Sequence, residues 1–167
     1  MKSKRLRITL IILLAVFVVI VRGYMGYGIP TSWNKTVIQT ISLYVTMGLG
    51  KALGGILSDA FGMRKVALFS VIGSLPFLLF GDNYMFISLF GIALFSMTMS
   101  ITLGLLVSVL KKTPGLAFGL TTIGLFLGTV PIFFIRLNTF RANAIVIIIF
   151  TLICLIALSK IIRKDKV

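Results

Sequence analysis

Long apolar segments alternate with short polar loops along this chain, and this alternation restricts its fold more than any other feature. Apolar runs recur between Ile8 and Ile162, several of them near the ~20 residues that an α-helix needs to cross a bilayer. With 59% apolar residues and a mean hydropathy of +1.15, the 167-residue chain is too hydrophobic for a soluble domain of this length. We therefore expect a single all-α integral membrane domain, residues 1–167, with no separate soluble domain.

The positions of the polar loops predict six transmembrane helices. Thr113 is suited to cap the fifth of them, and Pro114 suits its first turn. We interpret the first apolar segment as a retained span rather than a signal peptide, because no small-residue cleavage pattern follows it. The expected helices cover residues 8–30, 35–58, 64–80, 85–110, 114–135 and 142–162.

The basic residues lie mostly in loops and tails, and their distribution predicts the topology. Twelve of the basic residues lie in tails and loops that this layout places on one side of the membrane, and three lie on the other side. Because basic residues accumulate in cytoplasmic loops, we expect both termini in the cytoplasm. The net charge of +14 then reflects topology and contact with anionic lipid rather than binding of nucleic acid. We expect a multi-pass protein of a bacterial or archaeal inner or plasma membrane.

Several functional classes are excluded by the residue types that are missing. The sequence contains no histidine, one cysteine and only three acidic residues, all of them aspartates. We therefore expect no disulfide, metal site or cofactor, and no enzymatic activity, because neither a ligand cluster nor a nucleophile–base arrangement is available. A proton relay inside the membrane needs a titratable carboxylate or histidine, so we expect uniport or exchange rather than proton symport.

The most specific motif lies between the second and third expected helices. It reads Gly55-x3-Asp59-x2-Gly62-x-Arg64-Lys65, where Gly62 permits a tight turn and the basic pair anchors the cytoplasmic side. This spacing, together with the helix count, resembles the signature loop between helices 2 and 3 of major facilitator superfamily transporters. The position after Asp59 is usually basic in that family and is Ala60 here.

The resemblance implies one half of a transporter, because members of this family usually contain two six-helix halves. Residues 22–30 resemble helix 7 of such transporters more than helix 1, which favours a second half. One half alone does not enclose a pathway between two bundles. We therefore expect a homodimer, and the alternatives are a complex with a separately encoded half and a truncated fragment of a longer protein.

Two cations inside the expected helices are the main candidates for substrate binding. Arg22 lies fourteen residues beyond Ile8, roughly 21 Å along the helix. Its guanidinium suits bidentate contact with carboxylate or phosphate, whereas the alternative is an anchor that reaches the outer interface. Lys51 lies eight residues before Asp59 and extends the same positive lining, unless it reaches the interface or pairs with Asp59. The neutral hydrogen-bonding candidates are Tyr24, Tyr27 and Gln39.

The resemblance adds two expectations about mechanism. Paired arginines on helices 1 and 7 bind the anion in phosphate and organophosphate exchangers of that family, and two copies of Arg22 would reproduce such a pair. In the family, the aspartate that matches Asp59 helps to close the cytoplasmic side, here against the start of the other subunit's fifth helix at Thr113. A helix N-terminus favours a carboxylate there. A local bridge from Asp59 to Arg64 or Lys65 is the alternative, and both can hold.

The function expected from these features is a membrane transporter half that dimerises. It would form an alternating-access pathway for a small anionic solute, by uniport or exchange. The alternative is a non-transporting membrane subunit that assembles with a separately encoded partner half. The gating or signature-loop residues are Gly55, Asp59, Gly62, Arg64, Lys65 and Thr113.

Overall fold

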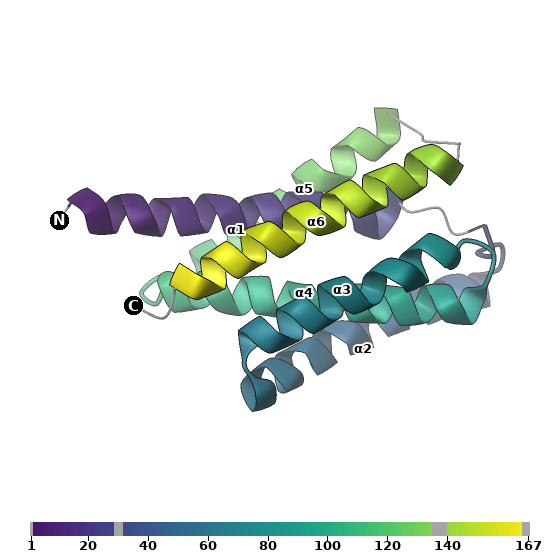
Figure 1. Cartoon of the computed structure of the whole chain (residues 1–167), viewed down its shortest axis with the longest axis horizontal. Coiled ribbons are helices and arrows are strands. Elements are labelled where there is room, and N and C mark those ends of the chain that lie inside the picture. The colour runs from purple at the N-terminus through teal and green to yellow at the C-terminus, as the bar shows by residue number, and fades with distance from the viewer. Residues whose placement is uncertain (1, 29–31, 135–139, 165–167) are drawn as a thin grey trace.

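A computed structural model describes residues 2–28, 32–134 and 140–164, which form six α-helices and contain no strand (Figure 1). Of these, α1 to α5 are long and apolar enough to cross a membrane, which supports an integral membrane protein. The described apolar part of α6, Ile145–Leu158, is shorter. The bounds are α1 Lys2–Gly28, α2 Val37–Phe61, α3 Met63–Phe80, α4 Met85–Val109, α5 Pro114–Phe134 and α6 Phe140–Lys164.

Two helices, α1 and α2, extend well beyond one of their expected ends. The first begins at Lys2, so the basic residues expected in a tail belong to its first turns. Lysine and arginine are good helix formers, and neither glycine nor proline precedes the apolar run. Helix α2 continues to Phe61, which places Asp59 in its last turn rather than in a loop.

Gly62 alone separates α2 from α3. Its φ of +89° lies in the region that glycine adopts without a clash of Cβ. The N–H of Gly62 donates a hydrogen bond to the carbonyl oxygen of Ser58 at 3.0 Å, which completes the last turn of α2. The prediction of a tight turn at Gly62 is confirmed.

Successive helices run in opposite directions along the long axis of the molecule. The start of α1, the α2–α3 turn, the α4–α5 turn and the end of α6 lie at the left end in Figure 1. The end of α1, the start of α2, the α3–α4 turn and the start of α6 lie at the other end. The basic pairs at residues 64–65 and 111–112 therefore lie at the same end as the first residues of α1.

The packing partners repeat with an offset of three helices. The α1–α5 contact corresponds to the α4–α2 contact, and α1–α6 corresponds to α4–α3, while α1–α4 and α3–α6 each correspond to themselves. The α2–α3 and α4–α5 contacts have no counterpart of similar extent in the described residues. Helices three apart in the chain run in opposite directions, so the contacts that do correspond relate α1–α3 to α4–α6 as an inverted repeat.

Glycines allow the backbones to approach closely in the corresponding pairs α1–α5 and α2–α4. A Cβ added to Gly128 of α5 would meet the carbonyl oxygen of Ile20 and the Cα of Gly23 in α1. A Cβ added to Gly54 of α2 would lie 2.5 Å from the carbonyl oxygen of Met97 in α4. Small residues at such positions favour helix association in a bilayer because they increase van der Waals contact.

The large side chains that are almost fully buried in the core belong to α1, α3, α4 and α6. Val18 of α1, Val71 of α3, Ile101 and Leu105 of α4 and Leu158 of α6 are at most 1% exposed. The buried residues described in α2 and α5 are all small: Gly50, Gly54, Ser58, Ala117, Thr121, Gly124 and Gly128. The large apolar side chains of α2 and α5 therefore point away from this core, and they flank the site described next.

Candidate functional site

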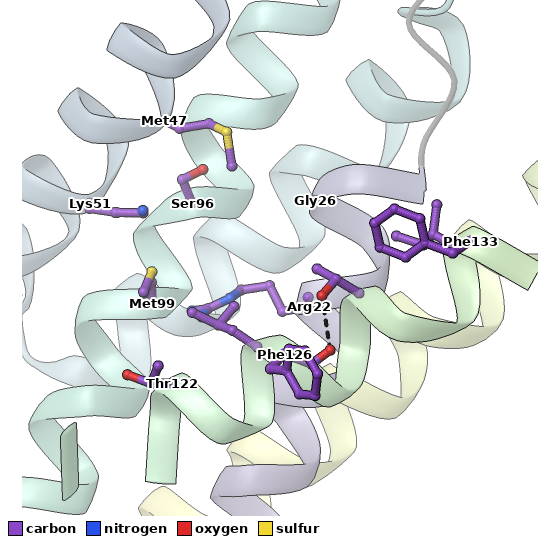
Figure 2. A pocket seen from close by; sticks show the side chains of 13 residues that line it. Arg22, Gly26, Met47, Lys51, Ser96, Met99, Thr122, Phe126 and Phe133 are labelled. Carbon is purple, nitrogen blue, oxygen red and sulfur yellow. Dashed lines mark hydrogen bonds between the residues drawn. The ribbon is translucent and has the colours of Figure 1, made fainter. Parts of the chain in front are cut away.

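A pocket of about 510 Å³ is formed by α1, α2, α4 and α5 (Figure 2). It lies between the packed pairs α1–α5 and α2–α4. In the described part of the chain, none of its lining residues comes from α3 or α6. The lining residues are Arg22, Gly23, Gly26, Met47, Lys51, Ser96, Met99, Thr122, Leu125, Phe126, Thr129, Ile132 and Phe133.

Arg22 is the most deeply buried charge in this lining. It is only 5% exposed, and neither Nη1 nor Nη2 has a hydrogen-bond partner among the described residues. Buried polar groups in proteins are almost always hydrogen-bonded, and a buried charge without a partner is strongly unfavourable. The guanidinium of Arg22 is therefore available to any group that brings hydrogen-bond acceptors into the pocket.

Lys51 brings a second cation to the pocket from α2. Figure 2 shows the side chains of Arg22 and Lys51 extending into the pocket from opposite sides. Their electrostatic interaction is repulsive, because both carry positive charge. The two aspartates in the described ranges, Asp59 and Asp82, do not line the pocket. An anion placed between the two cations would relieve this repulsion and satisfy the guanidinium.

The backbone around Lys51 is held tightly against α4. Lys51 lies between Gly50 and Gly54, the glycines at which α2 approaches α4. The hydroxyl of Ser100 in α4 donates a hydrogen bond to the carbonyl oxygen of Lys51. The position of this lysine along α4 is thus set by close packing and by an interhelical hydrogen bond.

The remaining lining is mostly apolar, with three hydroxyl groups. The hydroxyl of Thr122 donates to the carbonyl oxygen of Phe118 at 3.0 Å. The hydroxyl of Thr129 donates to the carbonyl oxygen of Phe126 at 2.8 Å, which is the dashed line in Figure 2. Because the hydroxyl hydrogens of these two threonines are bonded to the backbone of α5, the hydroxyl oxygens can accept but not donate hydrogen bonds in the pocket. The third hydroxyl belongs to Ser96.

The structure brings together two of the predicted substrate-binding residues, Arg22 and Lys51. Tyr24 does not line the pocket and packs instead on Phe150 of α6, edge to face, with ring centroids 5.4 Å apart. The side chain of Tyr27 lies outside the described residues.

Gln39 also lies away from the pocket, at the start of α2. Its Oε1 accepts hydrogen bonds from the backbone N–H groups of Lys35 at 3.0 Å and Thr36 at 3.1 Å. In return, the hydroxyl of Thr36 accepts one from the N–H of Gln39 at 3.3 Å. This reciprocal arrangement is a capping box, so the amide of Gln39 stabilises the N-terminus of the helix.

The predicted gating residues lie at the end of the molecule that carries the α2–α3 and α4–α5 turns. Asp59, Arg64 and Lys65 are exposed, and no ion pair joins them in the structure, although all three are described. The local bridge considered for Asp59 is therefore not formed here. Gly55 faces Ser100, whose Cβ would lie 3.9 Å from an added Cβ.

Thr113 takes its expected place at the start of α5. Its carbonyl oxygen accepts hydrogen bonds from the N–H groups of Leu116 at 3.1 Å and Ala117 at 3.4 Å. The residue is exposed, at the same end of the molecule as Asp59 (Figure 1).

Helix α5 supplies the part of the lining that sequence reasoning missed. The spacing of these residues, three or four apart, puts them on one helical face. That spacing carries little signal by itself, because α5 is apolar apart from three threonines, of which Thr122 and Thr129 line the pocket. The missed residues of α5 are Thr122, Leu125, Phe126, Thr129, Ile132 and Phe133.

Comparison with known proteins adds nothing to this geometry. The chain matches no protein-family model, no curated protein and no solved structure. Its function has to be argued from the pocket, the cations and the packing of the helices.

Proposed function

We propose that this protein is half of a membrane transporter, and that it dimerises to form an alternating-access pathway for a small anionic solute. The observation that carries this proposal is the guanidinium of Arg22, which is 5% exposed and has two unpaired nitrogens in a pocket shared with Lys51. A buried, unpaired cation in a membrane protein marks a substrate or ion pathway.

The packing of the helices supports a relationship to the major facilitator superfamily. Six-helix halves of these transporters contain two inverted triplets. The same offset relates α1–α5 to α4–α2 and α1–α6 to α4–α3 in this chain. It adds to the resemblance of the loop from Gly55 to Lys65, which contains the turn at Gly62. The basic pairs at one end of the bundle support the assignment of that end, and of both termini, to the cytoplasm.

A second copy of the chain is the partner that we propose. In a single copy, the pocket face and the apolar side chains of α2 and α5 beside it face lipid, and Lys51 in it is only half-buried. A charge that faces lipid costs several kcal/mol in some estimates. A two-fold axis along the membrane normal would place two such faces together, so that each copy covers the other's cations.

The pocket supports uniport or exchange rather than proton coupling. Its lining, as far as the structure describes it, contains no carboxylate, histidine or other group that titrates near neutral pH. Substrate binding at Arg22 and Lys51 therefore depends on the anion alone, and no residue of the pocket has to gain or lose a proton during transport.

The small residues on one face of α2 do not favour the alternative of a non-transporting subunit. Gly50 and Gly54 contact Ala93, Ser96 and Met97 of α4 within the same chain. These two glycines are therefore used in folding the six-helix unit and are not free for assembly with a different protein.

Uptake into proteoliposomes tests the proposal. We expect labelled methyl phosphate to enter vesicles that contain the wild type, and Arg22→Ala to reduce the rate by about 100-fold, since it removes a charged bidentate donor. Lys35→Ala, which removes an exposed cation outside the pocket, should retain uptake. A protonophore should leave uptake unchanged while the substrate gradient remains.

The outcome that would reject the anion site is equal uptake by wild type and Arg22→Ala, both reconstituted with the same oligomeric state. Uptake that stops when only the pH gradient is removed would reject uniport and exchange but not the site itself.

A further inference from the structure

The pocket has a cationic level and an apolar end. Arg22 and Gly26 lie four residues apart on α1, which separates them by one helical turn, about 6 Å. Lys51 and Met47 have the same separation on α2, which runs in the opposite direction. The antiparallel run therefore places Gly26 and Met47 on the same side of the two cations.

The side of the pocket that contains Gly26 and Met47 extends from α1 to α2. A Cβ added to Gly26 would lie 3.8 Å from Cε of Met47, so α1 and α2 meet across the pocket one turn beyond Arg22 and Lys51. Helix α5 borders the same end with Ile132 and with Phe133, which is largely exposed. In Figure 2, Met47 lies above Lys51, and Phe133 lies above Arg22 and to its right.

The two parts of the pocket differ in what they can bind. The cationic level offers the unpaired guanidinium of Arg22, the ammonium of Lys51 and the hydroxyl of Ser96. The far end offers a thioether, an aromatic ring and aliphatic groups, and no charge among its described residues. A fully hydrophilic anion such as inorganic phosphate would leave this apolar end unfilled or hydrated.

We propose that the natural ligand is an amphiphilic anion, with one phosphate or carboxylate group held by Arg22 and Lys51 and an apolar body lying against Met47, Ile132 and Phe133. This inference rests on the proposed anion site and adds the substrate class. Two sources share the chemistry: a water-soluble organic phosphate or carboxylate, and an anionic lipid such as phosphatidate.

Gly26 sets the length of the apolar end. Apart from Met47 Cε, no atom of the described residues outside its immediate backbone surroundings comes within 4 Å of an added Cβ. A larger side chain at this position is therefore accommodated by α1 and occupies the space that we assign to the apolar body. Gly104 of α4 is the matched position, since no atom in the described part of the chain lies within 4 Å of its added Cβ and it does not line the pocket.

Calorimetric titration of the full chain in phosphatidylcholine nanodiscs tests this inference. We expect phenyl phosphate to bind roughly 10- to 100-fold more tightly than methyl phosphate, because the ring adds buried apolar area to the same head group. Gly26→Leu should remove that preference, and Gly104→Leu should keep it. Phe133→Ser, which removes apolar surface without filling the pocket, should also reduce the preference.

A second set of nanodiscs, which contain phosphatidate, identifies the source of the ligand. If a bilayer lipid is the occupant, phosphatidate will weaken phenyl phosphate binding to the wild type. If the ligand comes from water, phosphatidate will leave binding unchanged. Either result, together with the phenyl preference, agrees with an amphiphilic anion.

Different results overturn the inference and the proposed function. Equal affinities for methyl and phenyl phosphate, both lost in Arg22→Ala, would reject the apolar body and leave the anion site standing. Failure of either phosphate to bind the wild type more tightly than Arg22→Ala would reject the anion site, and the amphiphilic ligand with it.

Discussion

The burial of Arg22 disfavours the folded state, whereas the proposed anion binding depends on it. Its charge is buried, and its two Nη atoms are without hydrogen bonds to the described residues. Substitution of a buried charge by an apolar side chain of similar size is often neutral or stabilising, whereas removal of one member of a formed ion pair is destabilising. Since the structure assigns Arg22 no such partner, it belongs to the first case.

We predict that Arg22→Met raises the free energy of unfolding by about 1–3 kcal/mol in the absence of added anions, because it removes an uncompensated buried charge. Thermal unfolding in detergent measures the change. Arg22→Lys, which keeps a buried charge, should show no gain. Methyl phosphate should raise the Tm of the wild type and leave that of Arg22→Met unchanged, since only a protein that binds a ligand is stabilised by it. A lower Tm for Arg22→Met would instead make this arginine a structural residue.

Local sequence explains why two of the predicted binding residues, Tyr24 and Gln39, lie away from the pocket. Thr36 and Gln39 have the three-residue spacing of a capping box, a signal present in the sequence that assigns Gln39 to the end of α2. Tyr24 is two positions from Arg22, and residues two apart lie on different faces of a helix. Helical spacing alone therefore separates Tyr24 from the face of Arg22, in agreement with its contact to Phe150.

The glycine contacts between α1 and α5 position one wall of the pocket. Gly23 and Gly128 meet backbone to backbone, and Gly23 itself lines the pocket beside Arg22. A methyl group at position 128 has no room, because the carbonyl oxygen of Ile20 and the Cα of Gly23 occupy the space.

We predict that Gly128→Ala destabilises the protein by about 1–3 kcal/mol, because α1 and α5 have to move apart to admit the methyl group. Gly119→Ala, on the same helix with nothing within 4 Å of its added Cβ, should have no such effect. Unfolding of both variants in mixed micelles with increasing SDS measures the difference. Equal stability of the two variants would show that the close α1–α5 contact is not required.

The helices themselves were easier to anticipate than their ends. Each apolar segment forms its own hydrogen-bonded helix, so its existence follows from local composition. The ends of α1 and α2 differed because helix-forming polar residues, including Asp59, continue a helix until a residue such as Gly62 interrupts it. Small residues four apart at Gly50, Gly54 and Ser58 mark the packing face of α2 in the sequence, whereas the faces of α5 are harder to tell apart because the helix is almost entirely apolar.

The arrangement of the six helices leaves one face at which we propose that a second copy packs. It is formed by α1, α2, α4 and α5, and it contains the pocket with both cations. Helices α3 and α6 pack on each other and contribute nothing to this face in the described residues. If two copies meet at the pocket, α2 is close to the interface and the outer surface of α3 is far from it.

Disulfide cross-linking in the membrane tests this geometry. In a Cys154→Ala background, we predict that Gly48→Cys, an exposed position on α2, forms a covalent dimer on mild oxidation, because α2 borders the pocket. Ile72→Cys, which is 59% exposed on α3, should remain monomeric. The products are measured by electrophoresis without reducing agent. Cross-linking through position 72 but not 48 would place the interface on the opposite face.

The existence of the helices follows from the chain's composition, because each helix satisfies its own backbone hydrogen bonds, and the distribution of the basic residues predicts how the helices cross the membrane. The choice of neighbours does not follow in the same way. Lipid tails are as apolar as most side chains of these helices, so partners are selected by shape, at contacts such as Gly128 on Gly23 and Gly54 on Met97. Those contacts bring Arg22 and Lys51, on separate helices, into one pocket.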